Sequence, residues 1–162
     1  MAHRNFIRAF ALAAGFLAAA ASSGCGGHSF SVGTPTGFVV LDDQAPAYDY
    51  RATTADGVVI GIRELKHEPK GDDAFWVQAI KNQMRAMSGY ALLETTNVTT
   101  KGGLRGTQLR FGHDEKGEPL QYEVTIFVTE KKIYVVECGG TKAQMDRLAA
   151  QLKWVIESFQ AG

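Results

Sequence analysis

The stretch that decides the fold is Leu120–Cys138, which reads LQYEVTIFVTEKKIYVVEC. Residues 120–129 alternate in hydropathy with a period of two, which is typical of a β-strand whose two faces differ. One face carries Tyr122, Val124, Ile126 and Val128, and the other carries Gln121, Glu123, Thr125 and Phe127. Because the second face is mostly polar, we expect it to be only partly covered or solvated. The tight turn at residues 130–132 predicts antiparallel pairing with a second strand at 133–138.

More β-strands precede this pair. The further β-rich runs are residues 38–41, 48–52, 58–65, 90–98 and 104–111. Asp56-Gly57 is the dipeptide most typical of a two-residue hairpin turn, so residues 48–65 are expected to form one hairpin. Turns at residues 101–103 and 114–119 connect the later runs. Short connections of this kind predict an antiparallel sheet of about six strands.

Two segments have the 3.6-residue period of amphipathic helices. Asp72 or Asp73 can cap the first helix, and Gly89 can end it in a left-handed conformation. Thr141 can cap the second, over residues 142–159. The side chains expected to face inward are Trp76, Ala79, Ile80, Gln83, Met84 and Met87 in the first helix, and Met145, Leu148, Leu152, Val155, Ile156 and Phe159 in the second. Strands grouped apart from two helices predict an α+β domain rather than a doubly wound parallel sheet.

The first 24 residues predict an export signal. Arg4 and Arg8 precede an apolar stretch, residues 9–21, that is shorter than the about 20 residues of a membrane span. Small residues then lead into Cys25, as in the bacterial motif at which a cysteine is lipidated, although Ser22 stands where that motif usually has Leu. We interpret residues 1–24 as a lipoprotein-type signal peptide and Cys25 as the lipidated residue. The alternative is plain signal-peptide cleavage nearby, which leaves Cys25 unmodified.

The composition after the signal changes once more. Residues 25–37 are rich in Gly, Ser, Thr and Pro, which is typical of a flexible tether, and residues 38–162 are expected to form a single α+β domain. Gly26 provides no acidic retention signal, which favours the outer over the inner membrane. The chain has 17 basic and 17 acidic residues, a balance that argues against a nucleic-acid partner. Its two cysteines exclude a disulfide scaffold and a four-cysteine zinc site.

The order hairpin, helix, meander and long C-terminal helix resembles the PsbP-like fold family over residues 38–159. The residues that carry the resemblance are Asp56–Arg63 (DGVVIGIR), Phe75-Trp76, Gly89-Tyr90, Leu104–Thr107 (LRGT) and Ile133–Glu137 (IYVVE). That family includes extrinsic lumenal proteins of photosystem II, a yeast Ran-binding protein and small bacterial lipoproteins of unknown function. The resemblance implies an α/β/α sandwich with a role in protein binding or assembly. It names no partner, because fold does not fix function.

The sequence lacks the common catalytic and nucleotide-binding motifs, namely G-x-S-x-G, the Walker A loop, G-x-G-x-x-G and H-E-x-x-H. We therefore expect a protein that is not an enzyme, with no catalytic residue, cofactor or metal. The alternative is a metal-dependent hydrolase that uses His113 with nearby carboxylates, since His113-Asp114-Glu115 combines imidazole and carboxylate ligands. Lys116 and Gly117 beside them are typical of an exposed turn instead. Cys138 ends a strand and is expected to lie in the core.

Two surfaces are candidates for binding. On the helix over 142–159, Trp154 lies opposite the apolar stripe, on the side that carries Arg147. Trp and Arg are enriched in binding hot spots, so these two residues are candidate partner-binding residues, unless another part of the chain, such as the tether, covers Trp154. A further alternative is a small-ligand carrier with a pocket over Gln121, Glu123 and Thr125. We expect an exported, lipid-anchored protein of the bacterial cell envelope that binds an unidentified envelope protein without catalysis.

Overall fold

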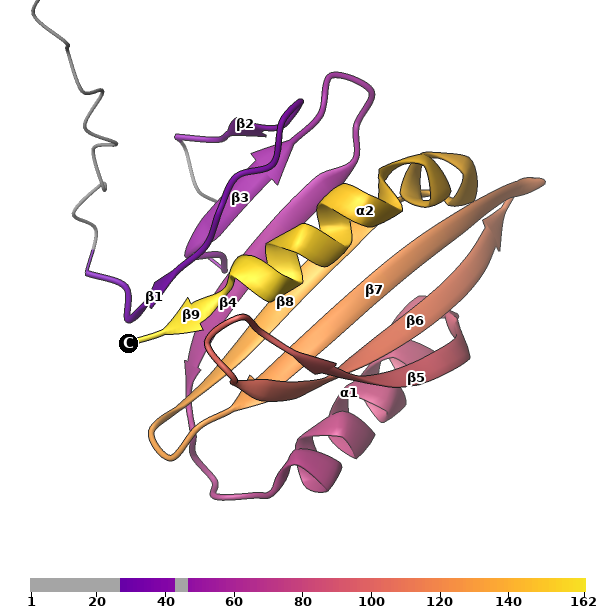
Figure 1. Cartoon of the computed structure of the whole chain (residues 1–162). Coiled ribbons are helices and arrows are strands. Elements are labelled where there is room, and N and C mark those ends of the chain that lie inside the picture. The colour runs from indigo at the N-terminus through magenta and orange to yellow at the C-terminus, as the bar shows by residue number, and fades with distance from the viewer. Residues whose placement is uncertain (1–26, 43–46) are drawn as a thin grey trace, which may run out of the picture.

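The computed structural model describes residues 27–42 and 47–162, which form a twisted antiparallel sheet with one helix on each face (Figure 1). The predicted signal peptide, residues 1–24, and Cys25 lie outside the described residues. In the part of the chain that is described, no helix is long and apolar enough to cross a membrane.

Seven strands form the main sheet in the order β2-β3-β4-β8-β7-β6-β5, and all neighbours are antiparallel. Their bounds are β2 Val39–Val40, β3 Tyr50–Thr53, β4 Val59–Lys66, β5 Ala91–Thr99, β6 Arg105–Glu115, β7 Glu118–Val128 and β8 Lys132–Thr141. The predicted α+β class and antiparallel pairing are confirmed, but the sheet has seven strands rather than about six. Asp56-Gly57 turns between β3 and β4 as predicted, with Gly57 at a φ of 94° that glycine adopts without strain.

The two helices begin and end close to the predicted residues. α1 (Asp73–Ser88) follows Asp72, whose side chain accepts a hydrogen bond of 2.8 Å from the backbone N–H of Phe75, and Gly89 ends it at a φ of 64°. α2 (Lys142–Ser158) follows Thr141, which forms a reciprocal capping box with Gln144. The predicted stripe of α2 is buried as expected except at Leu148, which is only partly buried. In α1, however, Val77 is buried although it lies outside the predicted stripe, and Gln83, inside that stripe, is exposed.

The sheet face beneath α2 is more deeply buried than its polar pattern predicted. Phe127 and Thr125 are fully buried, and Gln121 and Glu123 are each only 8% exposed, so the expectation of a partly solvated face is wrong. The reason is that Phe159, the residue after α2, stacks its ring on Phe127 at 5.0 Å between centroids. On the opposite face, α1 covers a second apolar cluster that includes Leu109, Phe111, Val124, Ile126, Ile133 and Val135.

Part of the expected flexible tether is folded onto the domain. β1 (Phe30–Ser31) pairs with β9 (Gln160–Ala161) in a separate two-stranded sheet, and Phe30 stacks on Phe159 at 5.7 Å. The Tyr134 hydroxyl also donates a hydrogen bond of 2.9 Å to the Ser29 carbonyl. The tether predicted over residues 25–37 is therefore wrong for residues 29–33, because Phe30 buries apolar surface there and β9 supplies backbone partners.

Candidate functional site

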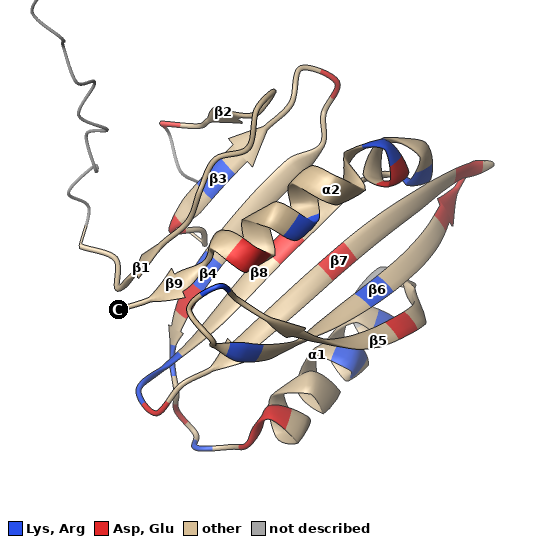
Figure 2. Ribbon diagram, in the orientation of Figure 1, with Lys and Arg blue, Asp and Glu red and all other residues tan. Residues whose placement is uncertain are grey.

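A groove of about 510 Å³ lies between α2 and the face of β5, β6 and β7, and we call it the α2 groove. The sheet contributes polar side chains to its floor, namely Gln108, Arg110, Gln121 and Glu123. The helix contributes both apolar and charged side chains to its wall: the apolar ones are Met145, Ala149, Leu152 and Ile156, and the charged ones are Asp146, Lys153 and Glu157. Acidic and basic residues lie on α2, β5, β6 and β7, the elements that line this groove (Figure 2). The groove is therefore amphipathic, with a polar floor on the sheet and a helix wall that is apolar only in part.

Strand alternation explains why these polar side chains share a face. In β7, Gln121 and Glu123 point toward α2, whereas Val124 joins the cluster beneath α1. In β6, Arg110 faces the groove and Leu109 is buried on the other side, next to α1. Arg110 and Glu123 are direct partners in the β6–β7 register, so their side chains meet across the strands.

Glu123 is the centre of a hydrogen-bonded cluster on this floor. Its Oε1 accepts hydrogen bonds from Arg110 Nε at 3.0 Å and from Gln121 Nε2 at 3.1 Å, and its Oε2 accepts a longer one of 3.4 Å from Gln108 Nε2. Arg110 also donates to Glu94 on β5 at 2.6 Å. Only 8% of Glu123 is exposed, and a carboxylate so deeply buried needs partners of this kind to remain charged.

The electrostatics of the cluster favour fixed polar recognition rather than proton transfer. The hydrogen bond from Arg110 to Glu123 raises the pKa of the guanidinium above its ordinary value, so Arg110 is a fixed positive charge. Cys138, on the same face of the sheet, is buried, and burial raises the pKa of its thiol so far that it is unreactive. The prediction of a core cysteine is confirmed.

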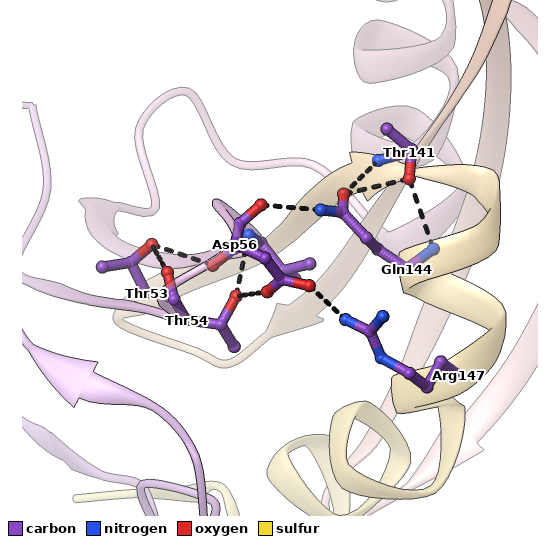
Figure 3. Close-up of polar contacts among 7 residues, drawn as sticks. Thr53, Thr54, Asp56, Thr141, Gln144 and Arg147 are labelled. Atoms are coloured by element: carbon purple, nitrogen blue, oxygen red, sulfur yellow. Dashed lines mark hydrogen bonds and ion pairs between the residues drawn. The ribbon is translucent and has the colours of Figure 1, made fainter.

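Arg147, predicted as a partner-binding residue, contacts its own chain. Its guanidinium forms an ion pair with Asp56 in the β3–β4 turn, and Gln144 Nε2 donates to the Asp56 carbonyl at 2.6 Å (Figure 3). Hydrogen bonds from Thr54 and Arg147 lower the pKa of the Asp56 carboxyl. These contacts link the first turns of α2 to the hairpin turn.

Trp154 contacts the N-terminal segment. Its ring lies so close to Gly33 that a Cβ on that glycine would come 2.2 Å from Cη2 of the indole, and the Gly33 N–H donates to Ser158 Oγ at 3.1 Å. Thr34 and Pro35 continue alongside the ring. Even so, 39% of Trp154 is exposed, so the segment covers one part of it and leaves another part open to solvent.

His113 lies near the tip of the β6–β7 hairpin, as predicted from the turn residues around it. Its ring packs beside Tyr90 at 5.1 Å between centroids. Across residues 27–42 and 47–162, no three His, Cys, Asp or Glu side chains come together in a group that could hold a metal ion. The described residues therefore give His113 no metal site to support the hydrolase alternative.

The sequence identified two of the four polar residues on the floor of the α2 groove. Gln121, Glu123 and Thr125 were predicted to share a polar sheet face, and Gln121 and Glu123 line the groove. Arg110 and Gln108 were missed, although they alternate with the buried Leu109 and Phe111 and so carry the same two-residue signal. Their proximity to Glu123 depends on the register between β6 and β7, which cannot be read from the sequence.

Comparison with protein-family models and with curated protein sequences finds no match. Several solved structures are similar. LpqN of Mycobacterium tuberculosis, described as involved in cell envelope biogenesis, has a TM-score of 0.66 at 12% identity, over 81% of this chain and 82% of that chain. The Ran-binding protein Mog1p of Saccharomyces cerevisiae has a TM-score of 0.55 at 11% identity, over 82% and 90%.

Cyanobacterial PsbP (CyanoP) of Synechocystis sp. PCC 6803 has a TM-score of 0.54 at 12% identity, over 89% of this chain and 99% of that chain. Identities this low show a shared fold and no more. The element order agrees with the resemblance found in the sequence, a hairpin, a helix, a meander and a long C-terminal helix. The chain therefore has the PsbP-like fold.

Proposed function

We propose that this protein is exported, is anchored in the bacterial envelope through a lipid on Cys25, and binds an amphipathic ligand in the α2 groove without catalysing a reaction. The observation that carries the proposal is the buried polar cluster around Glu123 at the floor of the groove. An envelope role is supported by the likeness to LpqN, whose own description is cell envelope biogenesis. The basic, apolar and small-residue order before Cys25 supports export and anchoring, preferentially at the outer membrane.

The groove has the dimensions and the chemistry of a binding site. Its volume of about 510 Å³ is within the range of small-molecule sites, about 300–1,000 Å³. The amides of Gln108 and Gln121 are held in place by Glu123, so they are ordered before a ligand arrives. A ligand with a polar edge and an apolar face would place the edge on these amides and the face against Leu152 of α2.

Site-specific photo-crosslinking in the native envelope tests this proposal. A photoreactive residue at Ala149, an exposed position on the groove wall, is expected to form an adduct of defined mass. The matched control is the same residue at Ala143, which is also exposed but lies about 120° away around α2 and does not line the groove. Gln108→Ala should weaken the Ala149 adduct. Equal adducts at both positions, or none at Ala149, would contradict the assignment of the groove.

A partner protein bound through Trp154 is the second candidate function. The observation that favours it is the 39% exposure of this large aromatic side chain beside Thr34 and Pro35. Arg147 would contribute less than the sequence suggested, because its guanidinium already pairs with Asp56. Loss of partner capture in Trp154→Ala, with crosslinking at Ala149 unchanged, would favour this surface over the groove.

A further inference from the structure

A second depression lies on the other face of the sheet, over β4, β8 and β7, with a volume of about 440 Å³. Its aromatic walls are Tyr48, Tyr90 and Tyr122, and we call it the tyrosine depression. Glycines form much of its floor. A Cβ on Gly61 would come 2.6 Å from the Tyr48 ring, and one on Gly139 would come 2.8 Å from the Tyr122 ring. Glycine at these positions is what lets both rings lie against the sheet.

Glu137 lies at the base of this depression with one oxygen in use and one unpaired. Its Oε1 accepts a hydrogen bond of 2.6 Å from Arg63 Nη2. Among the described residues, no donor reaches its buried Oε2 with the geometry of a hydrogen bond, and the buried Nε of Arg63 has no acceptor. The hydroxyls of Tyr48 and Tyr122 lie close enough to Glu137 for hydrogen bonding to it to help raise the pKa of both phenols. Only 8% of Glu137 is exposed, yet it lines the depression. A buried polar atom without a partner is costly, so a ligand that donates to Oε2 would recover that cost.

The surrounding charges decide which donor fits. Arg63 already balances the charge of Glu137, and the guanidinium of Arg51, which also lines the depression, lies 5.6 Å from the centre of the Tyr48 ring. Two cations and one carboxylate thus lie at the depression, which disfavours a cationic ligand. Burial, and then the charge of Glu137, raise the pKa of the Tyr48 and Tyr122 phenols, so the walls are neutral.

We propose that the tyrosine depression is a binding site for an uncharged ring-shaped molecule with an N–H or O–H donor. The flat face of the ring lies against the rings of Tyr48 and Tyr122, and the donor bonds to Glu137 Oε2. Aromatic heterocycles and sugar rings share this chemistry. The site is on the face opposite the α2 groove and shares one lining residue with it, Gln121. Tyr48, Tyr122 and Glu137, which carry the proposal, do not line the groove, so the proposal can be tested independently of the function proposed above.

A titration of the full chain with a matched pair of ligands tests the proposal. Indole and 1-methylindole have the same ring, but only indole has an N–H donor. We expect indole to bind and 1-methylindole to bind at least about tenfold more weakly, because Glu137 Oε2 would stay unpaired beneath it. Methyl β-glucoside tests the sugar source of the same chemistry, and benzyltrimethylammonium tests a cation. Calorimetry measures the affinities.

Three variants locate the binding. Tyr48→Leu removes one wall and Glu137→Gln removes the charged acceptor, and each should weaken binding of the preferred probe at least about tenfold. The matched control is Glu64→Gln, because Glu64 is also a shielded, ion-paired carboxylate but pairs with Lys132 outside the depression. If Glu137→Gln does not fold, Tyr48→Leu decides. The proposal is overturned if indole and the glucoside both fail to bind, if 1-methylindole binds as tightly as indole, if the cation binds best, or if Tyr48→Leu has no effect.

Discussion

Replacing Trp154 by Ala tests whether the N-terminal segment is docked on α2. Truncating a fully buried Trp costs about 3–5 kcal/mol. Because 39% of Trp154 is exposed, we scale this loss to about 2–3 kcal/mol in the free energy of unfolding. Urea denaturation followed by circular dichroism measures it. The control is Lys153→Ala, whose side chain is 76% exposed and whose loss should be below about 0.5 kcal/mol.

Gly33→Ala makes this test specific to the contact between the two segments. A Cβ at Gly33 would lie 2.2 Å from the indole, so this substitution should overpack the site and cost about 1–3 kcal/mol. In a Trp154→Ala background the ring is gone, and the same substitution should cost little. We expect a coupling free energy of at least about 1 kcal/mol in the double-mutant cycle. Additive effects, together with a Trp154→Ala loss below about 1 kcal/mol, would refute the docking of residues 33–35 on α2.

Three further predictions follow from the sequence and the fold. Cys25→Ser should abolish fatty-acid labelling and release the domain from membranes, and unchanged labelling would exclude modification at Cys25. Phe159→Ala should lower the free energy of unfolding by about 3–5 kcal/mol, because Phe159 is fully buried among Phe30, Phe127 and Tyr134. A loss below about 1 kcal/mol would contradict that packing. Burial opposes the charge of Glu64, but hydrogen bonds from Lys132 and Ser29 outweigh it and lower the pKa of this carboxyl. Its stabilising contribution is therefore present above the unfolded pKa of about 4.3 and is lost as the pH falls through the folded pKa. Glu64→Gln should therefore reduce the dependence of the free energy of unfolding on pH between pH 6 and 3. Denaturation measured across this range checks it, and a pH dependence equal to that of the wild type would refute it.

The sequence alone determined the elements, their order and their antiparallel arrangement. These features are local, because each depends only on residues that are close to one another in the sequence. They are the alternation in β7, the turn at Asp56-Gly57 and the caps at Asp72 and Thr141. Short connections then restrict neighbouring strands to antiparallel pairing. For the same reason the polar face bearing Gln121 and Glu123 was visible before the structure was known.

Tertiary structure alone decided what these elements bring together. Phe30 looked like part of a flexible tether because its neighbours are Gly, Ser and Thr, and only the packing of Phe159 and the pairing with β9 hold it in place. Likewise, Arg110 reaches Glu123, and Tyr48 lies on Gly61 beside Glu137, through registers and contacts between residues distant in the chain. Local periodicity states which face a side chain occupies, but the neighbour it meets there is set by strand register and by the burial of apolar surface between segments far apart in sequence.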